Sequence, residues 1–436
     1  MSNYTAAIDL GTTKIVTVIG EKTDNGRFRI LAYDEAESSG VRRGQVENIH
    51  NVINAIKPTL ENVCENAGID AIKDVYVGIA GQNISCKESR TDISRDNYGA
   101  IISEKEIKQL EENMYKMRME PGEEVLHVIP QSYSVDDSFG IQDPVGRLGQ
   151  RLSGNFHIII GKSASIQHSA LCIERLGLKL KKLILEPLAS ARAVLTEDER
   201  EVGVVVVDIG GGTTDMVIFH DGIVRHTAVI PFGGNSITED IKKGCGILHR
   251  QAEQIKIRYG SCLASMVPEN KIITVSGIAG REPREISFKT LAYIIEARME
   301  EIIGMALFEI ERSGYADKLP AGIVFTGGGA EINHLPQFIK LKTGMDVRIG
   351  KPEYVASNSA KDIAQPKYST AVGLIMCGFD CDESHDYTTK INKIKRKKTK
   401  EDKIAETSNK DKDKDNKFKT LIDSFFGFFE ENEEKV

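Results

Sequence analysis

The sequence lacks any long apolar run. No stretch of its 436 residues approaches the roughly 18 consecutive apolar residues that indicate a membrane-spanning helix. The first residues also lack the basic, apolar and small-residue order of a secretory signal. We therefore expect neither a spanning helix nor a signal peptide. A formal net charge of −7 gives no support to nucleic-acid binding by the whole chain.

Cysteines are few, and their pattern argues against a disulfide framework. They are odd in number and scattered, at positions 64, 86, 172, 245, 262, 377 and 381. We expect reduced, mostly buried thiols in a cytosol. Cys377 and Cys381 lie four residues apart, but no cluster of His or Cys accompanies them, so we expect no metal site there.

What the sequence does contain is typical of a soluble globular protein with two or more domains. The chain is 40% apolar and 28% charged, and it is long enough for more than one core. Strand patterns at 4–20, 28–34 and 75–81 alternate with helical spacing such as that of 48–67. This alternation predicts an α/β fold.

A polar segment from Gln82 to about Asn155 interrupts the alternation. Its charged helical stretch begins at Ser103, and Glu106 follows three residues later, which is the spacing of a capping box. We interpret the segment as an inserted small domain.

Two glycine-rich turns between apolar strands, about two hundred residues apart, are the main functional signal. They are "DLGTTK" at 9–14 and "DIGGGTTD" at 208–215. The backbone N–H groups of such turns form a nest that holds phosphate oxygens. Asp9 and Asp208 end the preceding strands and are candidates for holding Mg²⁺, largely through water. Threonine hydroxyls add possible donors: Thr12, Thr13, Thr213 and Thr214.

A third turn, "TGGGA" at 326–330, supports the same interpretation. "DLGTT" alone is also compatible with a hairpin closed by an Asx-type turn. Three consecutive glycines are more specific, because they weaken a sheet unless the backbone must approach something closely. The stretch "IIIGKS" at 158–163 is not a Walker A loop, since Phe156 stands where that motif needs Gly, and no G-x-G-x-x-G follows a strand. The paired turns predict a duplicated fold whose halves grip one polyphosphate from opposite sides.

These turns resemble those of the actin-like ATPase superfamily, which includes actin, MreB, Hsp70 nucleotide domains and sugar kinases. The stretches "LEPLASARAVL" at 185–195 and "STAVGLIM" at 369–376 resemble its two connecting helices. The resemblance implies ATP and Mg²⁺ as cofactors and places Glu186 where the attacking water is oriented. It implies nucleotide contacts by Gly11, Thr12, Thr13, Lys14, Gly210, Gly211, Gly212, Thr213, Thr214, Glu253, Lys256, Gly327, Gly328 and Gly329.

Within the superfamily the chain is similar to the FtsA family of bacterial cell-division proteins over residues 4 to about 380. The inserted segment stands where that family carries its own subdomain 1C, and residues 277–302 read like its subdomain 2B. The resemblance implies an ATP-binding protein that polymerises on the cytoplasmic side of the cell membrane at the division site. It would tether FtsZ filaments there during septum (Z-ring) assembly, with at most slow ATP hydrolysis.

The resemblance also implies partners: the C-terminal peptide of FtsZ, further copies of this chain in protofilaments, membrane lipids, and later proteins of the division machinery. We expect the FtsZ site within 236–312, as a shallow groove rimmed by basic residues such as Lys289, Arg298 or Arg312. The helices of this region are also compatible with packing alone.

The resemblance gives an order of domains along the chain. We expect subdomain 1A at 1–82, 156–200 and 361–384, subdomain 1C at 83–155, subdomain 2A at 201–237 and 313–360, subdomain 2B at 238–312, a disordered linker at 385–416 and an amphipathic membrane-targeting helix at 417–432. The linker is expected because nearly all of its residues are charged or polar. Its "KIKRKK" run at 393–398 is typical of solvated linker, and it can also act at a membrane surface.

The terminal helix is expected to lie in the membrane interface rather than to span the bilayer. At about 100° per residue, its apolar residues fall within an arc of about 160°. These residues are Phe418, Leu421, Ile422, Phe425, Phe426, Phe428 and Phe429. Residues 417–436 hold three lysines against five acids. We therefore expect apolar burial, rather than charge, to drive insertion.

A sugar or acetate kinase of the same superfamily is the alternative function. A kinase needs a general base for its acceptor, and we find no convincing one beyond the acids of the turns; it also has no use for a lipid-seeking tail. An Hsp70-like chaperone would need a substrate-binding domain, and only about fifty residues follow the nucleotide-binding part. His220 and His226 flank an Asp-Gly turn, and we expect them to be hairpin side chains rather than ligands.

Overall fold

The computed structural model describes residues 4–23, 26–95, 99–277, 282–353 and 361–382. It forms one compact unit up to Phe379, and a second unit begins at Asp380. The expected linker at 385–416 and membrane helix at 417–432 lie outside the described residues. Among the described helices, none combines the length and the apolar character needed to cross a membrane. All seven cysteines are free thiols.

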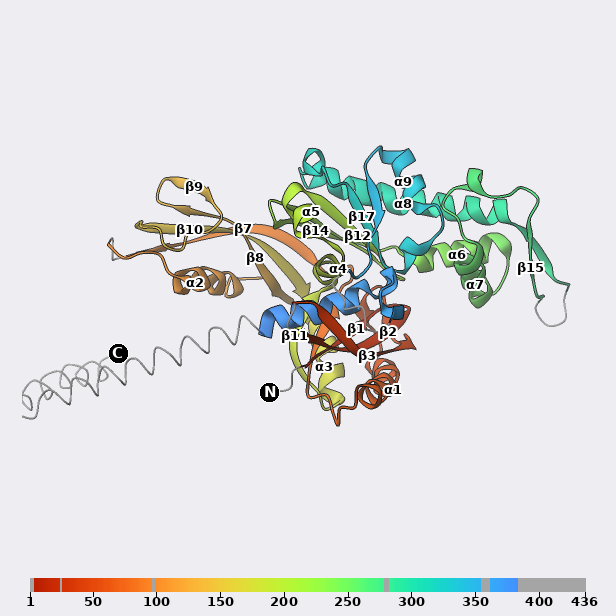
Figure 1. The fold of residues 1–436 in the computed structure, drawn as a ribbon, viewed down its shortest axis with the longest axis horizontal. Helices are drawn as coiled ribbons and strands as arrows, with labels where there is room; N and C mark the ends of the chain where they lie inside the picture. The colour runs from red at the N-terminus through yellow and green to blue at the C-terminus, as the bar shows by residue number, and fades with distance from the viewer. Residues whose placement is uncertain (1–3, 24–25, 96–98, 278–281, 354–360, 383–436) are drawn as a thin grey trace, which may run out of the picture. The chain divides into compact units, whose positions relative to one another are not determined.

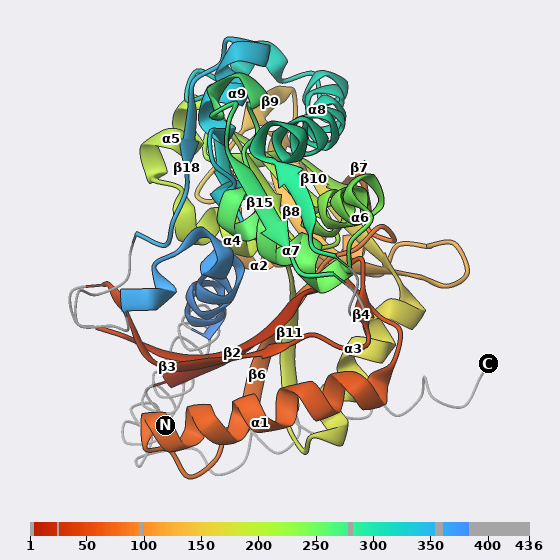
Figure 2. The ribbon, with the colours of Figure 1, turned by 90° about the vertical axis from the view of Figure 1, so that its right-hand side faces the viewer.

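The first half is built on a five-stranded sheet of order β11-β6-β1-β2-β3. Its strands are β1 (Tyr4–Leu10), β2 (Lys14–Lys22), β3 (Phe28–Glu37), β6 (Asp74–Ile79) and β11 (Lys179–Leu185). Helix α1 (Ile49–Ala67) lies along one face (Figure 2), and α3 (Ser163–Arg175) contacts α1. Asn48 caps α1 by accepting the N–H of Asn51 at 3.1 Å, so the helix expected from spacing begins one residue after Asn48.

The second half repeats this sheet. Its order, read from the corresponding end, is β18-β17-β12-β13-β14. The strands are β12 (Val204–Ile209), β13 (Thr214–His220), β14 (Ile223–Ile230), β17 (Ile323–Thr326) and β18 (Val347–Ile349). In both halves the first strand pairs antiparallel with the next one and parallel with a later one. The duplication predicted from the paired turns is confirmed (Figure 1).

The turn between β13 and β14 is the expected Asp-Gly hairpin. Asp221 and Gly222 have φ angles of 57° and 73°, which is the left-handed pair that a two-residue type I′ turn requires.

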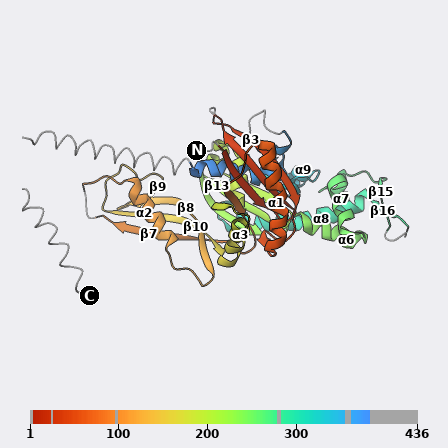
Figure 3. The ribbon, with the colours of Figure 1, turned by 90° about the horizontal axis from the view of Figure 1, so that it is seen from below.

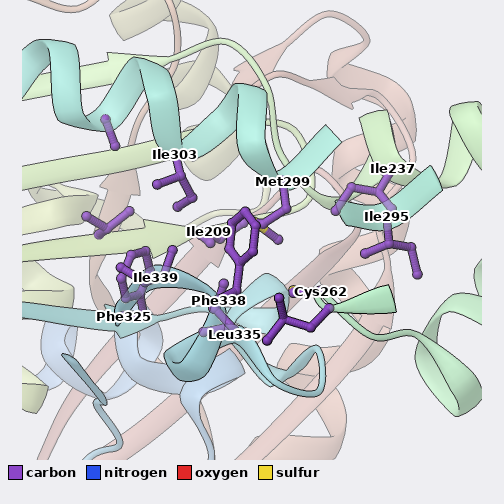
Figure 4. Packing of buried hydrophobic residues seen from close by; sticks show 14 of the residues in the cluster. Ile209, Ile237, Cys262, Ile295, Met299, Ile303, Phe325, Leu335, Phe338 and Ile339 are labelled. Atoms are coloured by element: carbon purple, nitrogen blue, oxygen red, sulfur yellow. The ribbon is translucent and has the colours of Figure 1, made fainter. Parts of the chain in front are cut away.

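Helices form the core of the second half together with this sheet. They are α6 (Gly234–Cys245), α7 (His249–Tyr259), α8 (Phe288–Arg312) and α9 (Leu335–Thr343), with a small hairpin of β15 (Ile272–Val275) and β16 (Arg284–Ser287). Met299 and Ile303 of α8 lie toward Phe338 of α9 and Ile209 of β12 (Figure 4). This apolar cluster fixes α9 and the end of β12 relative to each other.

The inserted segment forms its own four-stranded sheet of order β7-β10-β8-β9. Its elements are β7 (Ser85–Ser94), α2 (Glu104–Tyr115), β8 (Glu123–Val135), β9 (Ser138–Ile141) and β10 (Arg151–Lys162). Leu110 and Met114 of α2 are buried against Phe156 of β10. The capping box is confirmed, since the Ser103 N–H donates to Glu106 Oε2 at 2.8 Å.

Strand β10 is continuous across the expected end of the insert at residue 155. It pairs with β7 and with β8 over its length, out to residues 160–162. The apolar stretch 156–162 therefore belongs to the sheet of the insert (Figure 3) rather than to the sheet of the first half.

Short elements connect these parts. They are β4 (Val41–Arg42), β5 (Gln45–Val46), α4 (Glu186–Val194) and α5 (Glu197–Val202). A further helix begins at Ser369. Helix α4 follows β11 directly, so the last residue of an edge strand is also the residue before Glu186.

Candidate functional site

A cavity of about 360 Å³ lies between the two halves and is lined by the three glycine-rich turns. The structure brings together here nearly all of the predicted site residues: Asp9, Gly11, Thr12, Thr13, Lys14, Glu186, Asp208, Gly210, Gly211, Gly212, Thr213, Glu253, Lys256, Gly327, Gly328 and Gly329.

Thr214 is the one predicted nucleotide contact that does not line the cavity. Side chains alternate along a strand, so Thr214 faces away from the side on which Thr213 and Asp215 lie. It is fully buried, and its hydroxyl donates to the carbonyl of Phe232 at 2.9 Å. Its role here is to join the second turn to the chain before α6.

The two phosphate-type turns meet because they occupy the same corner of the two similar sheets. A Cβ built on Gly211 would lie 2.5 Å from Cγ2 of Thr13 in the other half. In the third turn Gly327 has a φ of 82°, and a Cβ there would lie 2.2 Å from Oδ1 of Asp208. These glycines are thus required by close approach, as the sequence pattern indicated.

Four buried carboxyl groups come together at the cavity. Burial raises the pKa of Asp9 to about 7, opposed by Lys14 and aided by Asp208. Burial, then the charges of Asp9, Asp215 and Asp208, raise the pKa of Glu186 well above its ordinary value. Burial also raises the pKa of Asp208, against the hydrogen bonds that it accepts. The cavity therefore favours positive charge, because these groups resist ionising together.

Asp208 and Asp215 lie directly opposite each other on β12 and β13. Ser190 and Thr370 donate their hydroxyls to Oδ2 of Asp208. Thr213 donates to Oδ2 of Asp215 at 2.7 Å, whereas Oδ1 of Asp215 is buried without a hydrogen-bond partner among the described residues. Burial raises the pKa of Asp215 to about 7. An oxygen left in this state is suited to a water or an ion.

No group of three His, Cys, Asp or Glu side chains converges closely enough to ligate one metal ion, as far as the described part of the chain goes. The carboxylates still suit Mg²⁺, because this ion prefers oxygen ligands and keeps much of its water shell. They would hold it through water, as the sequence interpretation supposed for Asp9 and Asp208.

Lys14 and Lys256 line the cavity from opposite halves, and both are hydrogen-bonded. Lys14 donates to the carbonyl of Lys367 at 2.6 Å and lies 4.1 Å from the ring centroid of Tyr368. Burial lowers the pKa of Lys14 to about 8 despite Asp9 and Glu35. Lys256 donates to Glu253 Oε2 at 2.7 Å and to Gly234 O at 3.0 Å.

Several residues that the sequence analysis did not assign to the site line the same cavity. Asp215 stands in the quoted second turn, and Thr370 in the quoted second connecting helix, so a signal for both was present. Glu331 and Lys367 follow no pattern that marks them. Gly44 also lies here, where its N–H donates to Oγ1 of Thr12 at 3.1 Å.

The three basic residues expected at a partner groove are not brought together. Lys289 and Arg312 stand near opposite ends of α8, about 35 Å apart at 1.5 Å per residue. Each is paired with an acid, and so is Arg298: Lys289 with Glu269, Arg298 with Asp240 and Glu301, and Arg312 with Glu309. One short peptide therefore cannot contact all three.

Comparisons with known proteins agree with this fold. MreB5 of Spiroplasma citri bound to ADP superposes with a TM-score of 0.55 at 14% identity, over 88% of this chain and 99% of that one. The likeness shows an actin-like α/β fold. A family model described as "SHS2 domain inserted in FTSA" matches residues 81–160, and one described as "Cell division protein FtsA" matches residues 205–373.

Curated relatives extend the match over most of the chain. The cell division protein FtsA of Neisseria meningitidis serogroup B is 38% identical over 85% of this chain and 89% of its own. That of Escherichia coli K12 is 36% identical over 87% of this chain and 90% of its own. These names do not favour the sugar or acetate kinase alternative. The chain belongs to the FtsA family of cell division proteins.

Proposed function

We propose that this protein binds Mg-ATP in the cavity between its halves and uses it in cell division. The observation that carries the proposal is the meeting of two glycine-rich turns, one from each half, beside four buried acids. N–H groups of the turns at 11–13 and 211–213 and the hydroxyls of Thr12 and Thr13 would hold phosphate oxygens, whereas the N–H of Gly210 and the hydroxyl of Thr213 already donate within the second turn. Bound Mg²⁺ would neutralise phosphate charge, with Asp9 and Asp208 holding its water shell.

Glu186 is the proposed group that orients a water molecule for slow ATP hydrolysis. It lines the cavity as the first residue of α4. Its raised pKa favours the protonated carboxyl, and a cation bound nearby would lower this pKa because the cation favours the charged form. Hydrolysis would therefore depend on the ion as well as on the position of the carboxyl.

We propose that copies of the chain assemble into filaments through the insert. The insert carries exposed apolar side chains, including Phe139 and Leu148 with exposed fractions of 71% and 60%. A variant without residues 85–160 should keep ATP affinity and lose filaments on lipid in electron micrographs. Filaments of normal appearance would instead assign the insert another task.

The proposed FtsZ site is the beginning of α8. Lys289 stands one helical turn before Tyr293, whose exposed fraction is 57%, and Met266 nearby is exposed to the same degree. An acidic and apolar C-terminal peptide would find a cation and apolar surface together there. Arg298 is less suitable, because two acids, Asp240 and Glu301, bind its guanidinium, whereas Lys289 pairs with Glu269 alone.

The membrane contact is assigned to the terminal helix at 417–432, which would hold the protein on the cytoplasmic side of the cell membrane at the division site. Its support is the sequence pattern alone, since it lies outside the described residues. The lysine-rich run at 393–398 would add attraction to anionic lipid of about 1 kcal/mol per basic residue.

Recruitment of FtsZ to liposomes tests the whole proposal. Purified FtsZ should sediment with liposomes only when this protein is present with Mg-ATP. Lys289→Glu should reduce recruitment, and Lys340→Glu serves as the matched control, because Lys340 is an exposed side chain of α9. FtsZ that stays in the supernatant, although this protein pellets with the lipid, would exclude the tethering role.

A further inference from the structure

The insert contacts the first half through a histidine that reaches the strand end before Glu186. His127 lies in β8 of the insert and is 8% exposed. The backbone N–H of Leu185 donates to Nε2 of His127 at 3.1 Å. Leu185 is the last residue of β11, an edge strand of its sheet, so this N–H has no strand on its outer side to bind among the described residues. A side chain of the insert takes the place of that missing strand.

The position of Glu186 depends on the backbone before it. No hydrogen bond from a described residue holds the Glu186 carboxyl group. Its side chain lies beside Gly78 of β6, where an added Cβ would lie 3.1 Å from Cγ of Glu186 and 3.2 Å from Oε1. Residues 184 and 185 of β11 pair with 78 and 79 of β6. A small movement of the strand end would therefore move the carboxyl directly.

Nε2 of His127 remains a hydrogen-bond acceptor across the physiological pH range. Burial, together with the charge of Lys182, lowers the pKa of His127 to about 3, so the ring is neutral at any physiological pH. A neutral imidazole has one donor and one acceptor nitrogen. Because Nε2 accepts here, the proton is on Nδ1. The contact is thus a fixed support rather than a pH switch.

We infer that His127 is a positioning residue, which holds the end of β11 so that Glu186 points at the reacting phosphate, and which thereby makes hydrolysis depend on the insert. The inference rests on the proposed function, since it needs ATP in the cavity. It gives the insert a second task beside assembly. Forces on the insert from a neighbouring copy would reach Glu186 through one hydrogen bond and one peptide unit.

Gln131 provides a matched comparison on the same strand. It lies four residues after His127, and its Nε2 donates to the carbonyl of Val224 in β14 at 2.6 Å. It therefore also ties the insert to a strand edge, but to that of the second half and away from Glu186. If the insert only needs firm attachment, loss of either contact should have the same effect.

The test compares His127→Leu, His127→Gln and Gln131→Leu in the full chain. Each variant is measured for Mg-ATP affinity by calorimetry and for hydrolysis in a single turnover across pH. We expect His127→Leu to slow hydrolysis about 10-fold or more with nearly unchanged affinity, because misplaced groups cost rate rather than binding. The acid limb of its pH profile should move to lower pH, since a displaced Glu186 becomes better hydrated.

His127→Gln should restore rate and profile, because its Oε1 accepts at a similar position, and Gln131→Leu should leave both unchanged. Equal slowing in all three variants would overturn the inference in favour of general attachment. So would loss of affinity together with rate in His127→Leu. Tight ATP binding without turnover by the wild type would defeat this inference and leave the nucleotide site standing, whereas absent binding would defeat both.

Discussion

Gly212 of the second half lies against Thr12 of the first. A Cβ added to Gly212 would stand 2.5 Å from Oγ1 of Thr12 and 3.0 Å from Cα of Arg43. The hydroxyl of Thr12 is in turn fixed by the N–H of Gly44. The two halves therefore touch through a position that has no room for a side chain, and the turns close on each other only because it is glycine.

Gly212→Ala should weaken Mg-ATP binding roughly 10-fold, because an overpacked contact costs about 1–3 kcal/mol. Isothermal calorimetry measures the change. Gly304→Ala in α8 is the matched control, since nothing lies within 4 Å of a Cβ there. Equal affinity of the two variants would mean that the turns do not close around the nucleotide.

Asp208→Ala should weaken binding of Mg-ATP by about 10-fold or more, while ATP without the metal is affected little. The reason is that the carboxylate acts on the ion, and a hydrogen bond to a charged group contributes about 1.5–3 kcal/mol. Titrations with and without EDTA separate the two ligands. A loss that is the same in EDTA would show that Asp208 does not act through Mg²⁺. Asp221→Ala on the β13–β14 hairpin is the exposed control.

The contribution of Asp9 to the stability of the nucleotide-free protein should fall as pH rises from about 4 to 7, whereas His127, whose pKa burial lowers to about 3, contributes in the opposite direction. The folded-state pKa of Asp9 is raised to about 7 from an ordinary value near 4, so in this window the folded state binds more protons than the unfolded state. Asp9→Asn should therefore have a larger free energy of unfolding than the wild type at pH 8, by on the order of 1–3 kcal/mol, and should melt at a higher temperature there. At pH 4 the two proteins should melt at the same temperature. Thermal melts of both proteins at both pH values decide it, and a difference between wild type and Asp9→Asn that is the same at pH 4 and pH 8 would refute the raised pKa of Asp9.

Changing Phe425 and Phe429 together to Glu should release the protein from liposomes and leave ATP affinity intact. Thr420→Glu, on the polar side of the expected helix, should still sediment with neutral and anionic vesicles. About 0.5 M salt should weaken binding only modestly, because it screens exposed charges and not apolar burial. If salt alone strips the wild type, the anchor is electrostatic.

The local features of this fold were predictable, and the pairings between distant segments were not. The turns at 9–14 and 208–215, the cap at Ser103 and the Asp221-Gly222 hairpin follow from residue types over a few positions. The stretch 156–162 reads as a buried strand whichever sheet it joins, so its place in the insert was hidden.

The candidate site shows the same division. The glycines and Asp9 and Asp208 stand in recognisable turns, and the cavity includes them. Asp215 ends the turn at 208–215 and follows Thr213 by two residues, so the alternation of side chains along a strand already indicates that the two share a face. The hydrogen bond between His127 and Leu185 joins residues 58 positions apart on strands of two different sheets. Hydrophobic periodicity along the sequence therefore cannot predict it.

The ends of the insert are neighbours. Ser85 and Ile160 are partners in the β7–β10 ladder, and antiparallel partners have Cα atoms only about 5 Å apart. More than seventy residues are thus inserted between two points of the first half that lie no farther apart than the ends of a tight turn. A short loop between these two points would be enough to close the chain of the first half without the insert. Such a segment can be exchanged between relatives as a unit, because neither the order of the surrounding strands nor the path of the chain through them depends on what the loop contains.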